Sequence, residues 1–239
     1  MLIKPRGGKR KGAGRPPKGA RAGAPHKERE FPNARYPVHV VLRVVAAVGQ
    51  LRRRSVYHAI RIATRTAARR ENFRIIHLSI QRTHVHLIVE ADNKSALARG
   101  MQGFEISAAK HINAAISKGR PGPRRRGAVF PDRYHTELIT SPRQARHTLL
   151  YVMNNFRKHQ EDRSAITRTW PIDWFSSACT FPDWKELVDR TVVLQTPATY
   201  EPLPVCPPQT WLLRDGWKKS GPISCFDVPS AQERRTRLP

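Results

Sequence analysis

The chain has 239 residues, of which 44 are Lys or Arg and 18 are Asp or Glu, so its formal net charge is +26. A one-signed charge of this size opposes compaction by self-repulsion and favours a polyanionic partner, and nucleic acid is the obvious one. The cysteines Cys179, Cys206 and Cys225 show no CxxC spacing. Their pattern excludes a complete disulfide framework and a recognisable zinc site.

The first 30 residues predict a disordered basic arm. They carry ten Lys or Arg and two Glu among many Gly, Ala and Pro, and such a segment buries too little apolar surface to offset the entropy of ordering. Gly14-Arg15-Pro16 resembles the core of an AT-hook, and a generic phosphate-binding tail is the alternative. In both interpretations Arg15 contacts DNA. No signal peptide or membrane span is visible, so we expect a soluble cytoplasmic protein associated with the nucleoid and not with a membrane.

Residues 31–160 alternate between strand and helix periodicity, with Ser55 and Ser141-Pro142 as helix starts. The predicted elements are a strand over 37–45, a helix over 55–70, strands over 73–80 and 85–91, a helix over 94–118, a strand over 135–140 and a helix from 141 to 159. The order β-α-β-β-α-β-α predicts an α+β fold with a ferredoxin-like antiparallel sheet and one extra terminal helix.

Residues 161–239 have a different composition. Ten of the twenty prolines lie from Pro171 onward, and all five tryptophans lie from Trp170 onward. This region is too aromatic for disorder and too rich in proline for long regular elements. We therefore expect an irregular C-terminal appendage that packs partly on the domain formed by residues 31–160, with its tryptophans serving packing more than base stacking.

The segment from Thr83 to Glu90 contains a His-Val-His motif on a predicted strand. Residues two apart in a strand point to the same face, so His84 and His86 project together while Val85 and Leu87 face the core. Two such imidazoles are suited to hold one divalent metal ion, and two histidines on a solvent-facing strand are the alternative interpretation.

The last predicted helix carries an apolar stripe formed by Leu149, Val152, Met153 and Phe156. At 100° per residue, Tyr151 lies about 200° and Asn155 about 240° from Leu149, so both lie off the stripe and neighbour each other at i and i+4. An ordinary surface tyrosine is the alternative interpretation. Together with the histidine pair, these side chains form the set that phosphoryl transfer requires, namely a nucleophile and ligands for a charge-stabilising metal ion.

His-hydrophobe-His on a strand, followed by Tyr-x-x-x-Asn on a helix, resembles the HUH single-tyrosine transposases. The chain is most similar to the REP-associated tyrosine transposases, relatives of the insertion-sequence transposases that move as single strands. The resemblance covers roughly residues 35–228 and is carried by Tyr36 to Arg43, Phe73 to Glu90, Leu97 to Gly103, Val129 to His135, Tyr151 to Asn155 with Arg157, and more weakly by Ser176 to Ala178 and Thr210 to Trp217.

The resemblance implies that His84 and His86 bind Mg²⁺ or Mn²⁺, with Asn155 as third ligand. Family members commonly have Asn-Pro where this chain has Asn155-Phe156, so Asn154 and His147 remain alternative ligands. Tyr151 would attack single-stranded DNA, leaving a 5′-phosphotyrosine and a free 3′-OH, on hairpin-forming repeats and in a possible homodimer. A non-cutting DNA-binding protein on the same fold and a basic RNA-binding protein are the alternative functions.

Two groups of arginines are expected to contact phosphates, with solvated loops as the alternative. They are Arg52, Arg53 and Arg54 before the first helix, and Arg124, Arg125 and Arg126 in the loop after the second. Three further histidines, His39, His77 and His135, are expected to be structural. Tyr36, Tyr57, Tyr134 and Tyr200 are rival nucleophiles, but none of them combines a helix with an amide at i+4.

Overall fold

The computed structural model describes residues 33–131 and 133–229, and the predicted basic arm with Arg15 lies outside them. Its regular elements are β1 (Val38–Arg43), α1 (Arg54–Ala67), β2 (Phe73–Ile80), β3 (His84–Ala91), α2 (Lys94–Ser117), β4 (His135–Leu138), α3 (Pro142–Lys158), α4 (Lys185–Val188) and α5 (Trp211–Arg214). Short 3-10 turns lie among them, and the last is η4 (Gly216–Ser220). The predicted order β-α-β-β-α-β-α is confirmed through α3.

The four strands form one antiparallel sheet in the order β2-β3-β1-β4. This is the ferredoxin-like order that the element pattern predicted. A bulge interrupts β2 between Ile75 and His77. Because a bulge adds one residue to a strand, Ile76 and His77 both lie on the face of the sheet that α3 covers, while Leu78 and Ile80 lie on the face under α1 and α2.

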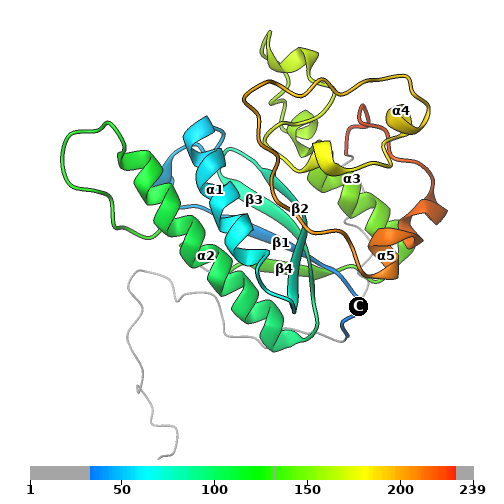
Figure 1. Cartoon of the computed structure of the whole chain (residues 1–239), viewed down its shortest axis with the longest axis horizontal. Coiled ribbons are helices and arrows are strands. Elements are labelled where there is room, and N and C mark those ends of the chain that lie inside the picture. Colours follow the sequence, from blue (N-terminus) through cyan, green and yellow to red (C-terminus); the bar gives the residue numbers. More distant parts are fainter. Residues whose placement is uncertain (1–32, 132, 230–239) are drawn as a thin grey trace, which may run out of the picture.

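Each face of the sheet is covered by different elements (Figure 1). On one face α1 and α2 lie side by side, and they pack on Val85, Leu87 and Val89 of β3 in a core of apolar side chains. On the other face α3 packs over β2 and β3 beside Ile88. The period of two in β3 thus divides its side chains between two separate cores.

Helix starts follow the sequence in one case and not in the other. Ser141 caps α3 by accepting a hydrogen bond from the Gln144 N–H at 3.2 Å, and Pro142 occupies the first turn, as predicted. The prediction that Ser55 caps the first helix is wrong. The helix begins at Arg54 after Arg53, whose side chain makes no capping bond. The backbone forms the helix start, since the Arg53 N–H donates to the carbonyl of buried Leu51 at 2.7 Å and the Tyr57 N–H donates to the Arg53 carbonyl at 2.9 Å.

The C-terminal segment, residues 161–229, covers the outer side of α3. Its Trp184 and Trp217 are buried, with 1% and 2% of their surface exposed, in the core that α3 shares with Ile76 and Ile88 of the sheet. Both α5 and η4 pack directly on α3. The helix is therefore enclosed between the sheet and the C-terminal segment. Within the described residues, no helix is long and apolar enough to cross a membrane.

Candidate active site

The two histidines of the motif lie where the strand period placed them. His84 and His86 are on the β3 face that α3 covers, and their ring centroids are 4.7 Å apart. His86 is buried, whereas His84 is half-buried. Burial, followed by the nearby positive charges of His159 and Arg43, lowers the pKa of His84 from 6.5 to about 4. Its imidazole is thus neutral at pH 7, and the neutral form is the one that binds metal ions.

A third histidine joins this pair. His39 of β1 places its Nε2 3.1 Å from Nδ1 of His86, and the two rings stack with centroids 5.3 Å apart. The sequence interpretation treated His39 as structural, because its neighbourhood depends on strand pairing. In the observed register His39 lies opposite Ile88, two residues along β3 from His86 and on the same face. Only the sheet order could have revealed this contact.

Tyr151 of α3 contacts both of these rings. Its ring lies 5.2 Å from His86 and 5.9 Å from His39, edge-on in each case. Nζ of Lys158, two turns further along the helix, lies 4.9 Å from the centre of the same ring. A half-buried phenol therefore lies beside two imidazoles and a cation, all from one chain.

Asn155 is fully buried, which the helical wheel did not predict. The wheel places it off the apolar stripe of α3, about 240° from Leu149. Tyr151 and His159, one turn before and one turn after it, contact the histidines of β1 and β3, so this side of the helix also packs on the sheet. Within the described residues, neither its amide nitrogen nor its amide oxygen has a hydrogen-bond partner. A buried amide without partners costs about 1–3 kcal/mol, so this side chain is suited to a ligand and not to a purely structural role.

The alternative amide next to it, Asn154, also has a buried oxygen without a hydrogen-bond partner among the described residues, but its nitrogen is committed elsewhere. The Asn154 side-chain nitrogen donates to the carbonyl oxygens of Ser224 at 3.0 Å and Asp227 at 2.9 Å, and so holds the C-terminal segment against α3. No three His, Cys, Asp or Glu side chains within residues 33–131 and 133–229 form a group that could hold a metal ion. A set made of His84, His86 and the amide of Asn155 is of a different composition, and the partnerless amide fits it.

Two rival tyrosines are unsuited to attack. Burial raises the pKa of Tyr57 to about 12, and its hydroxyl donates to the carbonyl oxygen of Glu201 at 2.8 Å. Burial likewise raises the pKa of Tyr200, which lies against Tyr57 and Cys179. His77 is also structural, since burial lowers its pKa to about 4 and its Nδ1 lies 3.1 Å from the Ser177 hydroxyl.

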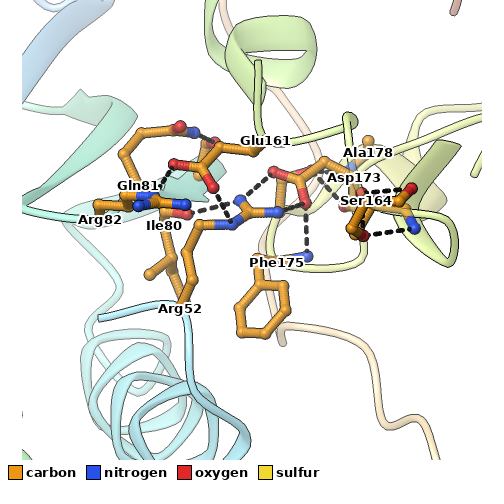
Figure 2. Close-up of polar contacts among 12 residues, drawn as sticks. Arg52, Ile80, Gln81, Arg82, Glu161, Ser164, Asp173, Phe175 and Ala178 are labelled. Atoms are coloured by element: carbon orange, nitrogen blue, oxygen red, sulfur yellow. Dashed lines mark hydrogen bonds and ion pairs between the residues drawn. The ribbon is translucent and has the colours of Figure 1, made fainter. Parts of the chain in front are cut away.

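Arg52 does not belong to the phosphate-contacting set. Figure 2 shows its guanidinium joined to both carboxylate oxygens of Asp173, at 2.9 and 2.8 Å, with a third bond to the Ile80 carbonyl at 3.0 Å. Its side chain is 6% exposed and lies over the Phe175 ring. Glu161 completes the cluster, 3.9 Å from Arg52 and 2.7 Å from Arg82. The buried pair of Arg52 and Asp173 joins the C-terminal segment to the end of β2, and the pair of Arg82 and Glu161 joins it to the turn that precedes His84.

The other sequence-predicted arginines divide by exposure. Arg53, Arg54 and Arg126 are exposed, which leaves them available to a polyanion. Arg124 is also exposed, although it donates to the Lys110 carbonyl at 2.9 Å. Arg125 is half-buried and bonds to Asn113 and to the carbonyls of Gly127 and Ala128, so it organises its own loop. It is therefore the least available of the second group.

Comparison with known proteins places this site in a family. Residues 33–155, just over half of the chain, match the model of the family described as transposase IS200 like. The match includes His39, His84, His86, Tyr151 and Asn155. The chain therefore belongs to the IS200-like transposase family, as the sequence resemblance predicted. No curated protein sequence matches it.

A solved structure shares the fold. It is described as the structure of a REP-associated tyrosine transposase bound to a REP hairpin, and it is similar to this chain with a TM-score of 0.50 at 17% identity. The match covers 72% of this chain and 89% of that one.

Proposed function

We propose that the protein cuts and rejoins single-stranded DNA, acting on hairpin-forming repeats with Tyr151 as the nucleophile. The observation that carries the proposal is the position of the Tyr151 ring, 5.2 Å from that of His86, with partnerless Asn155 one turn further along the same helix. The described DNA complex of the structurally similar transposase supports the choice of a hairpin substrate. The net charge of +26 supports a polyanionic partner.

The proposed step is a transesterification. The phenolic oxygen of Tyr151 forms a bond to phosphorus, and the bond from phosphorus to the 3′ oxygen breaks. The phenol loses its proton, the departing 3′ oxygen gains one, and a 5′-phosphotyrosine remains. Reversal by a 3′-OH rejoins the strand, so the energy of the phosphodiester is conserved and no nucleotide cofactor is required.

The proposed ligands for a divalent cation, Mg²⁺ or Mn²⁺, are His84, His86 and the side-chain oxygen of Asn155. Such an ion supplies charge stabilisation at the scissile phosphate. The protein residues supply position. Since Tyr151 and Asn155 are i and i+4 on α3, one rigid helix sets the phenol and the amide against the β3 histidines of the same chain. The proposal therefore has tyrosine and ligands acting in cis.

Single-stranded DNA would approach this site over a basic surface. Lys158 lies 4.9 Å from the Tyr151 ring and is suited to contact the phosphate that the phenol attacks. Exposed Arg53, Arg54, Arg124 and Arg126, and Arg15 of the N-terminal region, are proposed to contact phosphates further along the strand.

The test is a cleavage assay with Mn²⁺ on hairpin DNA that carries single-stranded flanks, read as a covalent protein–DNA adduct in a denaturing gel. Wild type should form the adduct and Tyr151→Phe should not, while hairpin binding stays within a few fold. Tyr134→Phe is the matched control, because it also removes one phenolic hydroxyl from a half-buried ring. Hairpin binding without an adduct in wild type would replace the proposal with a non-cutting DNA-binding protein.

A further inference from the structure

The five tryptophans of the C-terminal segment do not share one role. Trp184, Trp217 and Trp174 are at most 8% exposed and belong to the core around α3. Trp211, the first residue of α5, is 46% exposed. Its ring packs on Gly216, and Nζ of the flexible Lys219 side chain lies 5.1 Å from the ring centre. Nearly half of the indole remains open to solvent and offers a flat surface to a partner.

Trp211 lines a cavity of about 600 Å³, within the range of ligand sites. Tyr36 provides a second aromatic wall, and Arg35 provides an exposed cation. Arg74 and Asp92, joined at 3.0 Å, form a polar wall. The cavity therefore combines aromatic surface, positive charge and one carboxylate, which together match the stacking surface, the phosphate and the hydrogen-bonding edge of a nucleotide.

The wall that carries Trp211 is rigidly anchored. The carboxylate of Glu90, fully buried at the end of β3, accepts hydrogen bonds from the backbone N–H groups of Gln209 and Thr210, both at 2.9 Å, and from the Thr210 hydroxyl at 2.8 Å. Behind the indole lies Gly216, where a Cβ atom would come within 2.8 Å of the ring. Trp211 is thus held in place before any ligand arrives, which reduces the entropy lost on binding.

We propose that this cavity binds one unpaired base of single-stranded DNA, stacked on Trp211, with Arg35 contacting the adjoining phosphate. The inference rests on the proposed function, since it takes single-stranded DNA as the substrate. Pro142, at the start of α3, also lines the cavity. Tyr151 lies nine positions further along α3, a distance of about 14 Å along the helix axis. The bound base therefore lies outside the cleaved linkage and fixes which nucleotides flank it.

The experiment is an abasic scan. Full-length protein carrying Tyr151→Phe, so that the DNA is not consumed, is titrated with hairpins that have eight-nucleotide flanks and lack a single base at one flank position per probe. One or two adjacent positions should weaken binding by about 5- to 150-fold, the range for loss of one base–aromatic stack. With Trp211→Leu added, binding to the intact probe should fall by the same factor, and the scan should become flat.

Three further variants separate stacking from folding. Trp211→Phe should keep the sensitive position, because it retains an aromatic face. Phe226→Leu removes another exposed aromatic ring, 54% exposed and outside this cavity, and should leave the scan unchanged. Arg35→Gln should weaken binding to all probes by one common factor, since it removes a phosphate contact and no base contact.

The inference is overturned if no abasic position weakens binding to the protein with Trp211 intact. It is also overturned if the sensitive position persists when Trp211→Leu is added. Either result leaves the proposed function standing if the parallel assay with unmodified Tyr151 yields the covalent adduct. Absence of both hairpin binding and adduct overturns the two together.

Discussion

The two faces of the sheet differ in what they bury. Under α1 and α2, β3 presents only apolar side chains, such as Val85 and Leu87. Under α3 the same strand presents His84, His86 and the buried carboxylate of Glu90. Burying polar groups costs free energy of folding unless they have partners. The face under α1 and α2 therefore serves stability alone, whereas the polar side chains under α3 indicate a function beyond stability.

The largest expected effect is a difference between alanine substitutions of two neighbours on opposite faces of β3, His86 and Leu87. His86→Ala should abolish Mn²⁺-dependent adduct formation, because two remaining ligands hold the ion poorly. Mn²⁺ should also cease to raise the melting temperature, through the linkage between binding and folding. Leu87→Ala should instead lower the free energy of unfolding by about 2–5 kcal/mol and keep the response to Mn²⁺. Melting curves with and without Mn²⁺ measure both effects. If Mn²⁺ still raises the melting temperature of His86→Ala, the metal ion does not bind on this face of the sheet.

The next effect concerns the buried ion pair in Figure 2. Asp173→Asn removes the carboxylate that binds both ends of the buried Arg52 guanidinium and leaves only Glu161, 3.9 Å away, which should cost about 3–5 kcal/mol of unfolding free energy. The double variant Arg52→Met with Asp173→Leu should recover most of the loss. Asp215→Asn is the control, since its pair with Arg214 is exposed and should contribute less than about 1 kcal/mol. Equal losses for both asparagine variants in urea titrations would contradict the structural role of Arg52.

A smaller effect follows from His77. Its pKa is about 4 in the folded chain against 6.5 when unfolded, so the unfolded state binds more protons between these values and stability falls as the pH drops through that window. The loss should approach about 3 kcal/mol near pH 4. Urea unfolding from pH 7 to pH 4, with His77→Gln beside wild type, isolates this contribution. Parallel pH dependences in the two proteins would mean that His77 takes up no protons on unfolding.

The smallest effect concerns the first 30 residues. Deleting them removes ten Lys or Arg, so the slope of log K against log salt for hairpin binding should become shallower, while cleavage persists at saturating DNA. Binding titrations between 50 and about 200 mM salt measure the slope. If the slope stays the same, these residues make no phosphate contacts.

The sequence predicted the features that depend on neighbouring residues in the chain. The strand period placed His84 and His86 on one face, and Ser141-Pro142 marked the start of α3 to the residue. What the sequence could not show depends on contacts between distant segments. The contact of His39 with His86 requires the β1–β3 register, and the burial of Asn155 requires the packing of α3 on the sheet.

Arg52 shows the same limit, because the sequence predicted a surface role for a residue that a distant partner buries. In the sequence it belongs to a run of three arginines that resembles a phosphate-binding loop. Its partner Asp173 lies 121 residues away, and a composition argument treats all three arginines alike. The fold distinguishes them, because it buries one and leaves Arg53 and Arg54 exposed.

The enclosure of α3 between the sheet and the C-terminal segment has a consequence for biosynthesis. Chains emerge from the ribosome N-terminus first, at about 5–20 residues per second. The sheet, Tyr151 and all three proposed ligands are thus complete before Trp184 and Trp217, which cover the outer side of their helix, have been made. A nascent chain therefore carries every chemical group of the site while α3 still lacks its outer cover, and the enclosure of this helix is complete only when translation is nearly finished.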